Sequence, residues 1–146
     1  MGLTSKGESL NALIDELFQL NGRLLAAGDE MSANHGLTGA RWQVLAALKL
    51  EERPLTVAQI ARRMGLQRQS VQRLSDILVE QGVLAYHTNP DHKRAKLVDL
   101  TPKGREIFDQ TSKTQITWAN DITADFSIEE LTGTAAVLRK LKDAIG

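Results

Sequence analysis

Residues 56–81 read TVAQIARRMGLQRQSVQRLSDILVEQ. Thr56 and Gln59 have the spacing of a capping box and predict the start of a short helix. Gly65 ends that helix as a left-handed residue, and a second helix begins near Gln67. Two short helices joined by a sharp glycine turn are typical of a helix-turn-helix.

The second helix of this segment is amphipathic. Its apolar positions face a core: Val71, Leu74, Ile77 and Leu78. The remaining positions form a polar face: Arg68, Gln69, Ser70, Gln72, Arg73 and Asp76. Arg and Gln side chains match guanine O6/N7 and adenine N6/N7 in the major groove, so the face predicts DNA contact. The alternative is a solvated helix face, although such faces more often carry Glu–Lys pairs.

Two short runs follow Gly82. Residues 83–88 and 95–100 are rich in β-branched and aliphatic side chains and flank the polar turn 89–94. They predict a β-hairpin whose tip carries Lys93 and Arg94. A basic loop beside a recognition helix can reach the neighbouring minor groove.

Composition limits the remaining choices. The chain has 146 residues, 42% apolar and 25% charged, and no cysteine. This length suits one domain, and the lack of cysteine excludes disulfides, thiol switches and Cys-ligated zinc. No apolar run could span a membrane, and the N-terminus lacks a signal peptide or myristoylation pattern. We therefore expect a cytoplasmic protein.

The net charge is zero, but the charges are unevenly distributed. Residues 53–105 hold ten basic and four acidic side chains, whereas residues 1–52 and 106–146 each hold four basic and seven acidic ones. Because salt screens interactions between charges that are far apart, a polyanion would be attracted to the basic middle of the chain despite the zero net charge.

Long amphipathic helices are predicted on both sides of this middle. Apolar residues recur at spacings of three and four: Leu10, Leu13, Leu17, Leu20, Leu24, Ala27 and Met31. A second stripe adds Ile14, Phe18 and Leu25. Two stripes suggest one face for the chain's own core and one for a partner chain; alternatively, both fill a local core. Further helix starts are predicted at Thr38, Thr101 and Ser127, the first two running to about residues 50 and 124.

Several motifs together resemble the MarR family of winged helix-turn-helix transcriptional regulators. They are TVAQIA at 56–61, QSVQRL at 69–74, NPDHKRAK at 89–96 and LTPKG at 100–104. The resemblance implies a mainly α fold, a winged helix-turn-helix with a two-stranded β-hairpin wing and N- and C-terminal dimerisation helices. It also implies an obligate homodimer on palindromic double-stranded DNA, usually a repressor released by a small aromatic or phenolic effector.

The resemblance also divides the single domain, residues 1–146, into functional parts. Residues 1–36 and 125–146 would be dimerisation helices, residues 37–101 the DNA-binding lobe and residues 102–124 a connecting helix. The predicted DNA-binding residues all lie in the lobe: Thr56, Gln67, Arg68, Gln69, Ser70, Gln72, Arg73, His92, Lys93 and Arg94. The recognition helix would read bases, while Thr56, Arg73 and the wing would contact phosphate, sugar or the minor groove.

The wing departs from the family pattern, which usually reads Asp-x-Arg. Here His92 takes the acid position, Arg94 the arginine position, and Asp91 comes one residue early. Either Asp91 substitutes for the missing acid, or the arginine is less ordered. A protonated His92 would add a phosphate contact at low pH; alternatively, it is a turn histidine without a role. Gln67 replaces a better capping residue, which predicts a slightly frayed recognition helix.

The family's ligand pocket lies where the dimerisation helices meet the DNA-binding lobe. Carried onto this chain, it would be lined by Asn21, Arg41, Trp42 and Trp118. An arginine beside an indole suits an aromatic carboxylate, although Trp42 could equally be a core residue. We expect no metal site or cofactor, and no catalytic motif indicates an enzyme. The alternative function is a winged-helix adaptor that binds proteins and not an operator.

Overall fold

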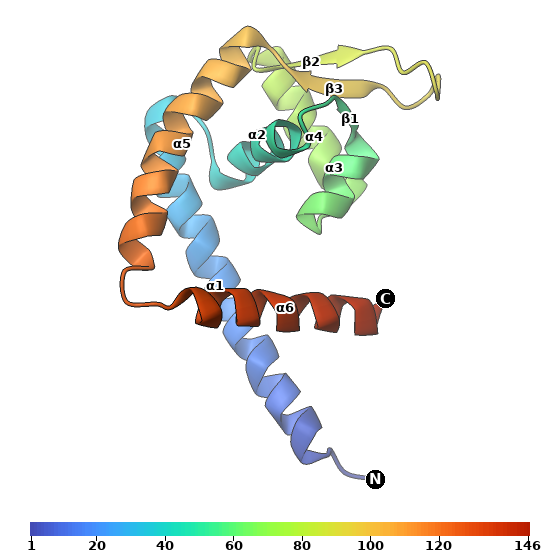
Figure 1. Cartoon of the computed structure of the whole chain (residues 1–146). Helices are drawn as coiled ribbons and strands as arrows, with labels where there is room; N and C mark the ends of the chain where they lie inside the picture. The colour runs from blue at the N-terminus through green and yellow to red at the C-terminus, as the bar shows by residue number, and fades with distance from the viewer. The chain divides into compact units, whose positions relative to one another are not determined.

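The computed structural model describes residues 1–146, which divide into two compact units, residues 1–111 and 112–146 (Figure 1). The elements are α1 (Ser5–Ser32), the short 3-10 helix η1 (Ala33–His35), α2 (Gly39–Glu51), β1 (Leu55–Thr56), α3 (Val57–Met64), α4 (Arg68–Glu80), β2 (Leu84–His87), β3 (Leu97–Leu100), α5 (Pro102–Ile122) and α6 (Ile128–Ile145). The boundary between the units falls within α5. None of these helices has the length and apolarity that a membrane crossing requires.

Most helices begin at the residues that the sequence predicts. Thr38 has extended backbone and accepts a hydrogen bond from the N–H of Arg41, 3.2 Å away. Ser127 does the same for Glu130 at 3.0 Å, and the Glu130 side chain completes the capping box. Each side chain satisfies a backbone N–H that has no partner within the helix. The predicted helix starts are therefore confirmed.

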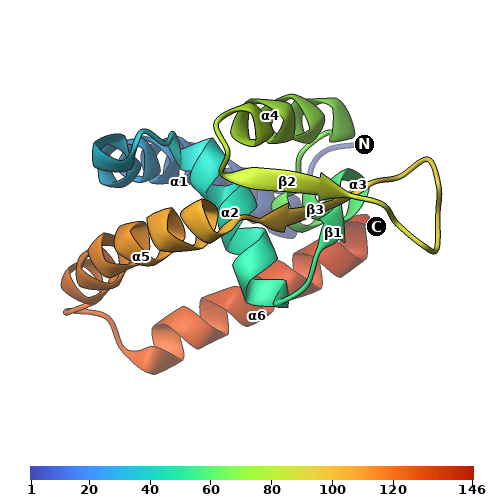
Figure 2. The same cartoon turned by 90° about the horizontal axis from the view of Figure 1, so that it is seen from above.

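The sheet contains one more strand than the sequence predicts. β2 and β3 form the expected antiparallel hairpin, with Leu84 opposite Leu100 and His87 opposite Leu97. β1 pairs with the other edge of β3, which places Leu55 opposite Val98 and gives the order β1-β3-β2. The loop between β2 and β3 extends beyond the strands (Figure 2). Because β1 leads directly into α3, the wing is hydrogen-bonded to the helix-turn-helix.

One hydrophobic core is shared by α2, α3, α4 and the sheet. It contains apolar side chains of α2, α3, α4 and the strands, and Ile107 and Phe108 of α5 pack against it. Val71 and Leu78 of α4 are fully buried as predicted, while Leu74 and Ile77 are half-buried. Ser75 is also fully buried, which the apolar pattern did not predict. These contacts orient the polar face of α4 outward.

α1 and α2 approach each other closely at Gly39. A Cβ at this position would lie 3.1 Å from backbone atoms of Leu25, Gly28 and Asp29. The Asp29 carboxylate accepts a hydrogen bond from the Gly39 N–H at 2.6 Å, so a residue of α1 caps α2. Contact at this distance leaves little room for a side chain at residue 39 between the two helices.

Both long terminal helices expose apolar side chains. On α1, Leu13 and Leu17 are half-buried, but Phe18 is 73% exposed and Leu24 is 45% exposed. α6 has no buried residue, and its Ile128 is 76% exposed. Of the second apolar stripe predicted for α1, Phe18 and Leu25 are exposed and Ile14 is half-buried, and Leu20 and Leu24 of the first stripe are exposed as well.

Candidate nucleic-acid interface

The polar face of α4 is exposed. Val71, Ser75 and Leu78 point into the core, while Arg68, Gln69, Gln72, Arg73 and Asp76 are exposed to solvent. Ser70 is half-buried, at the edge of this face. Gln67, which precedes the helix, makes no side-chain cap hydrogen bond, and the predicted fraying of the helix start stays a prediction. The first N–H groups of α4 are therefore left for water or another acceptor, as at many helix N-termini that face phosphate.

The turn between α3 and α4 depends on Gly65. Gly65 has φ 67°, and its N–H donates to the carbonyls of Ala61 and Arg62. This left-handed conformation ends α3 and lets the chain reverse within three residues. The sequence prediction for Gly65 is confirmed.

Thr56 lies at the start of α3, facing the wing. Its hydroxyl oxygen accepts from the N–H of Gln59 at 3.2 Å, and the Gln59 side chain accepts from the Thr56 N–H at 2.9 Å. The capping box is therefore complete. The hydroxyl hydrogen of Thr56 still has no protein acceptor, so it can donate to a phosphate oxygen.

The wing loop is held by Asn89, which is only 8% exposed. Its side-chain oxygen accepts from the N–H of Asp91 at 3.0 Å, and its carbonyl accepts from the N–H of His92 at 3.3 Å. The side chains of Asp91, His92, Lys93 and Arg94 are all exposed beyond this turn. No ion pair joins Asp91 to Arg94, so Asp91 does not substitute for the family acid here.

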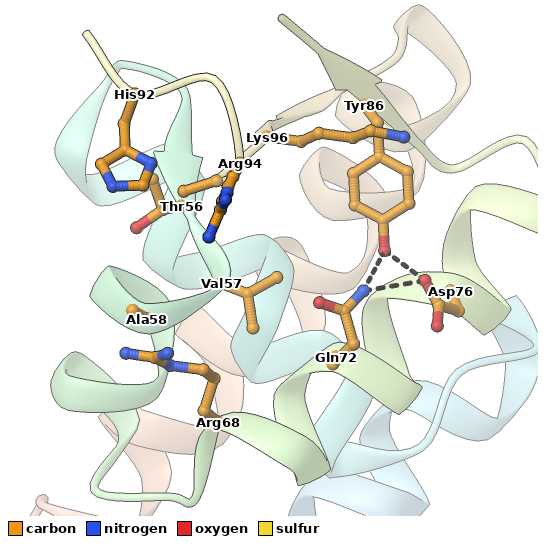
Figure 3. A pocket seen from close by; sticks show the side chains of 11 residues that line it. Thr56, Val57, Ala58, Arg68, Gln72, Asp76, Tyr86, His92, Arg94 and Lys96 are labelled. Atoms are coloured by element: carbon orange, nitrogen blue, oxygen red, sulfur yellow. Dashed lines mark hydrogen bonds between the residues drawn. The ribbon is translucent and has the colours of Figure 1, made fainter. Parts of the chain in front are cut away.

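α3, α4 and the wing together enclose a cleft of about 530 Å³. Figure 3 shows its lining, which includes five predicted DNA-binding residues from distant parts of the sequence: Thr56, Arg68, Gln72, His92 and Arg94. Gln69 and Arg73 lie on the neighbouring surface of α4. The structure thus brings recognition helix and wing to one face.

The cations on this face lack acidic partners. The structure contains four ion pairs: Lys49–Asp109, Arg53–Glu51, Arg63–Glu51 and Arg105–Asp99. Arg68, Arg73 and Arg94 are absent from all of them. The Nζ of Lys96 lies 5.7 Å from the centre of the Tyr86 ring, in a cation–π contact. Unpaired guanidinium groups on an exposed helix and loop can bind phosphate without first breaking a protein ion pair.

A polar cluster that the sequence analysis missed connects α4 to the wing. The amide nitrogen of Gln72 donates to Asp76 at 3.0 Å and to the Tyr86 hydroxyl at 2.9 Å. The Tyr86 hydroxyl donates to the same Asp76 oxygen. Burial, and next the hydrogen bond and negative charge of Asp76, raise the pKa of Tyr86 well above its usual value. The phenol therefore stays protonated at neutral pH.

The four residues predicted to line a ligand pocket have different surroundings. Trp42 stacks on Phe108 with ring centres 5.8 Å apart, and its buried indole N–H has no hydrogen-bond partner. Arg41 is half-buried beside it on α2, and Asn21 is exposed on α1. Trp118 belongs to the second unit. Trp42 is half-buried and packs against the core, and a ligand role for these four residues stays a prediction.

Comparison with known proteins bears on the identity of this fold. The sequence profile of the MarR family matches residues 35–95, which include α3, α4 and most of the wing. An uncharacterised protein of Mycobacterium tuberculosis is 34% identical over 134 residues, covering 92% of each chain. The chain belongs to the MarR family.

Other transcriptional regulators are similar over nearly the whole chain. The transcriptional activatory protein BadR of Rhodopseudomonas palustris is 29% identical over 95% of this chain and 81% of its own. The MarR family regulator Sco5413 of Streptomyces coelicolor is 28% identical, with TM-score 0.77 over 94% and 96% of the two chains. The regulator MosR of M. tuberculosis, solved in complex with DNA, is 21% identical, with TM-score 0.74 over 90% and 96%. The mainly helical winged fold is thus that of MarR regulators.

Proposed function

We propose that this MarR-family chain is a homodimeric regulator that binds a palindromic DNA site through α4 and the wing. The observation that carries the proposal is the face shared by α4 and the wing, where exposed arginines have no acidic partners. In this arrangement α4 would enter the major groove, with the wing at the flank. The complex of the related regulator MosR with DNA supports this role.

Residues of the interface divide by their chemistry. Arg68, Gln69 and Gln72 lie on the first turns of α4 and would face base edges, with Ser70 permitting close approach. Thr56, Arg73 and the wing residues Lys93 and Arg94 would contact phosphate, sugar or the minor groove and set the register. His92 lines the cleft, and its contribution at low pH stays a prediction.

The homodimer is supported by the apolar side chains that the single chain leaves exposed. Phe18 on α1 and Ile128 and Val137 on α6 are more than half exposed. A lone helix of α6's length gains little stability in water without a packed face, so a second copy would bury these residues. Two copies of α4 would then lie about 34 Å apart, one turn of DNA.

For regulation, we propose repression by occupancy of the operator, with release by a small aromatic effector. The ligand would have to bind a dimer with misplaced recognition helices more tightly than one with correct spacing. The relative BadR is an activatory protein, so a reporter-gene experiment is needed to distinguish repression from activation. A promoter carrying the selected site would be silenced by a repressor and stimulated by an activator.

The decisive experiment selects double-stranded DNA from a random pool with the purified protein. We expect an inverted repeat, bound with an affinity that falls steeply with salt because phosphate-bound counterions are released. Analytical ultracentrifugation at the protein concentration used for the selection should give the mass of a dimer. Recovery of no preferred sequence, with weak salt dependence, would instead favour the adaptor function.

A further inference from the structure

The side-chain amide of Gln72 is held by two other residues of the cleft. Its nitrogen lies 3.0 Å from an Asp76 carboxylate oxygen and 2.9 Å from the Tyr86 hydroxyl oxygen (Figure 3). Asp76 is one turn further along α4, whereas Tyr86 comes from β2. The cluster therefore connects the recognition helix to the wing at the position of a predicted base-reading residue.

The chemistry of the three groups determines which way the amide faces. A carboxylate can only accept hydrogen bonds, so the Gln72 atom that faces Asp76 must be the nitrogen. Its second hydrogen goes to the Tyr86 oxygen, and the Tyr86 hydroxyl hydrogen goes to Asp76. All three hydrogens of the cluster are used. The carbonyl oxygen of Gln72 has no protein partner in the structure.

This orientation changes what Gln72 can recognise. A free glutamine binds adenine through two bonds, accepting from N6 and donating to N7. With both amide hydrogens engaged, the side chain offers an acceptor alone. In the major groove its partners are the exocyclic amino groups of adenine N6 and cytosine N4, whereas guanine and thymine present acceptors there.

We propose that Tyr86 and Asp76 are positioning residues that make Gln72 an acceptor-only reader of DNA, selective for adenine or cytosine on the contacted strand. This inference rests on the proposed DNA-binding function and replaces the two-bond reading of adenine expected from sequence. Tyr86 is half-buried, and the charge of Lys96 lies over its ring, so the hydroxyl is held in place from the wing.

The test compares base preference among the wild type and the variants Gln72→Ala, Tyr86→Phe and Asp76→Asn. Sites are first selected from a random pool, and the position at which Gln72→Ala flattens the preference is identified. Duplexes with each of the four bases at that position then compete for binding. Tyr86→Phe removes one hydroxyl while keeping the ring, and matched thermal unfolding checks that each variant is folded.

For the wild type we expect adenine and cytosine to bind within about threefold of each other and about tenfold better than guanine or thymine. Tyr86→Phe frees one amide hydrogen of Gln72, which can then donate to adenine N7. That variant should prefer adenine over cytosine by about fivefold or more. Asp76→Asn allows the amide to flip and should weaken the discrimination against guanine and thymine.

Three results would overturn the inference, and they differ from one another. If Gln72→Ala changes no position while binding stays salt-dependent, Gln72 is not a reader and DNA binding survives. If Gln72→Ala flattens a position but Tyr86→Phe and Asp76→Asn leave it unchanged, the cluster does not set the preference. If the wild type selects no DNA at all, the proposed function fails and this inference fails with it.

Discussion

A side chain at Gly104 would overlap the carbonyl oxygen of Val83, because the first turn of α5 lies directly against the residue that precedes β2. The Thr101 hydroxyl donates to the Gly82 carbonyl at 2.6 Å, and the Thr101 N–H donates to the Val83 carbonyl at 3.1 Å. The Gly104 N–H in turn donates to the Thr101 hydroxyl oxygen at 3.1 Å. The start of α5 and the base of the wing are therefore one hydrogen-bonded joint.

This joint predicts that Gly104→Ala destabilises the fold. Overpacking against backbone should lower the free energy of unfolding by about 1–3 kcal/mol, measured by urea unfolding. Gly133→Ala is the matched control, since Gly133 lies in α6 with nothing near its Cβ position. It should raise stability by about 0.5–1 kcal/mol. Equal, small effects of the two substitutions would contradict the close contact.

The cap that α1 provides for α2 predicts a second stability effect. Asp29→Ala removes the acceptor of the Gly39 N–H and should cost about 0.5–2 kcal/mol of unfolding free energy. Asp29→Asn retains a side-chain oxygen and should recover most of that loss. Thermal unfolding of the two variants measures the difference. A loss as large in Asp29→Asn would assign the effect to the negative charge.

Tyr86 is the chain's single tyrosine, so its titration can be observed directly. Because burial and Asp76 raise its pKa, the ultraviolet absorbance of tyrosinate should develop only above the ordinary midpoint near pH 10. Asp76→Ala removes both the hydrogen bond and the negative charge of Asp76 and should lower the midpoint. A wild-type midpoint at about 10 would contradict the cluster.

The raised pKa of Tyr86 also makes the free energy of unfolding depend on pH. The protonated phenol is favoured in the folded state, so its contribution to stability is complete below the unfolded pKa of about 10. As pH rises from there through the higher folded pKa, the unfolded state releases its proton first and the free energy of unfolding decreases. Tyr86→Phe should remove this decrease, which urea unfolding at a series of alkaline pH values would show.

The wing predicts a specific change in the salt dependence of DNA binding. Arg94→Ala should weaken binding several-fold and reduce the slope of log affinity against log salt by about one, because one phosphate contact is lost. Lys49→Ala removes the same charge from α2, where it is paired with Asp109 at 3.8 Å. That control should leave both quantities almost unchanged. If the two variants behave alike, the effect comes from net charge and not from the wing.

The sequence predicted the parts of the fold that local chemistry determines. The capping boxes at Thr56 and Ser127 and the left-handed Gly65 involve residues within four positions of each other. Their hydrogen bonds can therefore be read from spacing. The polar face of α4 followed from the same reasoning, since helical periodicity alone separates Val71 and Leu78 from Arg68 and Gln72.

What the sequence did not predict depends on residues far apart along the chain. β1 is two residues long and exists because Leu55 lies opposite Val98. Tyr86 approaches Asp76 only once the hairpin packs beside α4, and no spacing rule relates these positions. Helical periodicity places Gln72 on the polar face, but it does not predict that Asp76 and Tyr86 engage the amide nitrogen of Gln72.

The short strand β1 also joins the wing to α3 without involving the wing loop. It pairs with β3 and leads directly into α3, while the loop from residue 88 to residue 96 extends beyond the sheet. Under the proposed function, recharging the exposed residues 91–94 of that loop would alter the flanking contacts of the wing, while Lys96 and Tyr86 stay in place beside Gln72. Contacts at the flank of the site and base preference at Gln72 could then change separately.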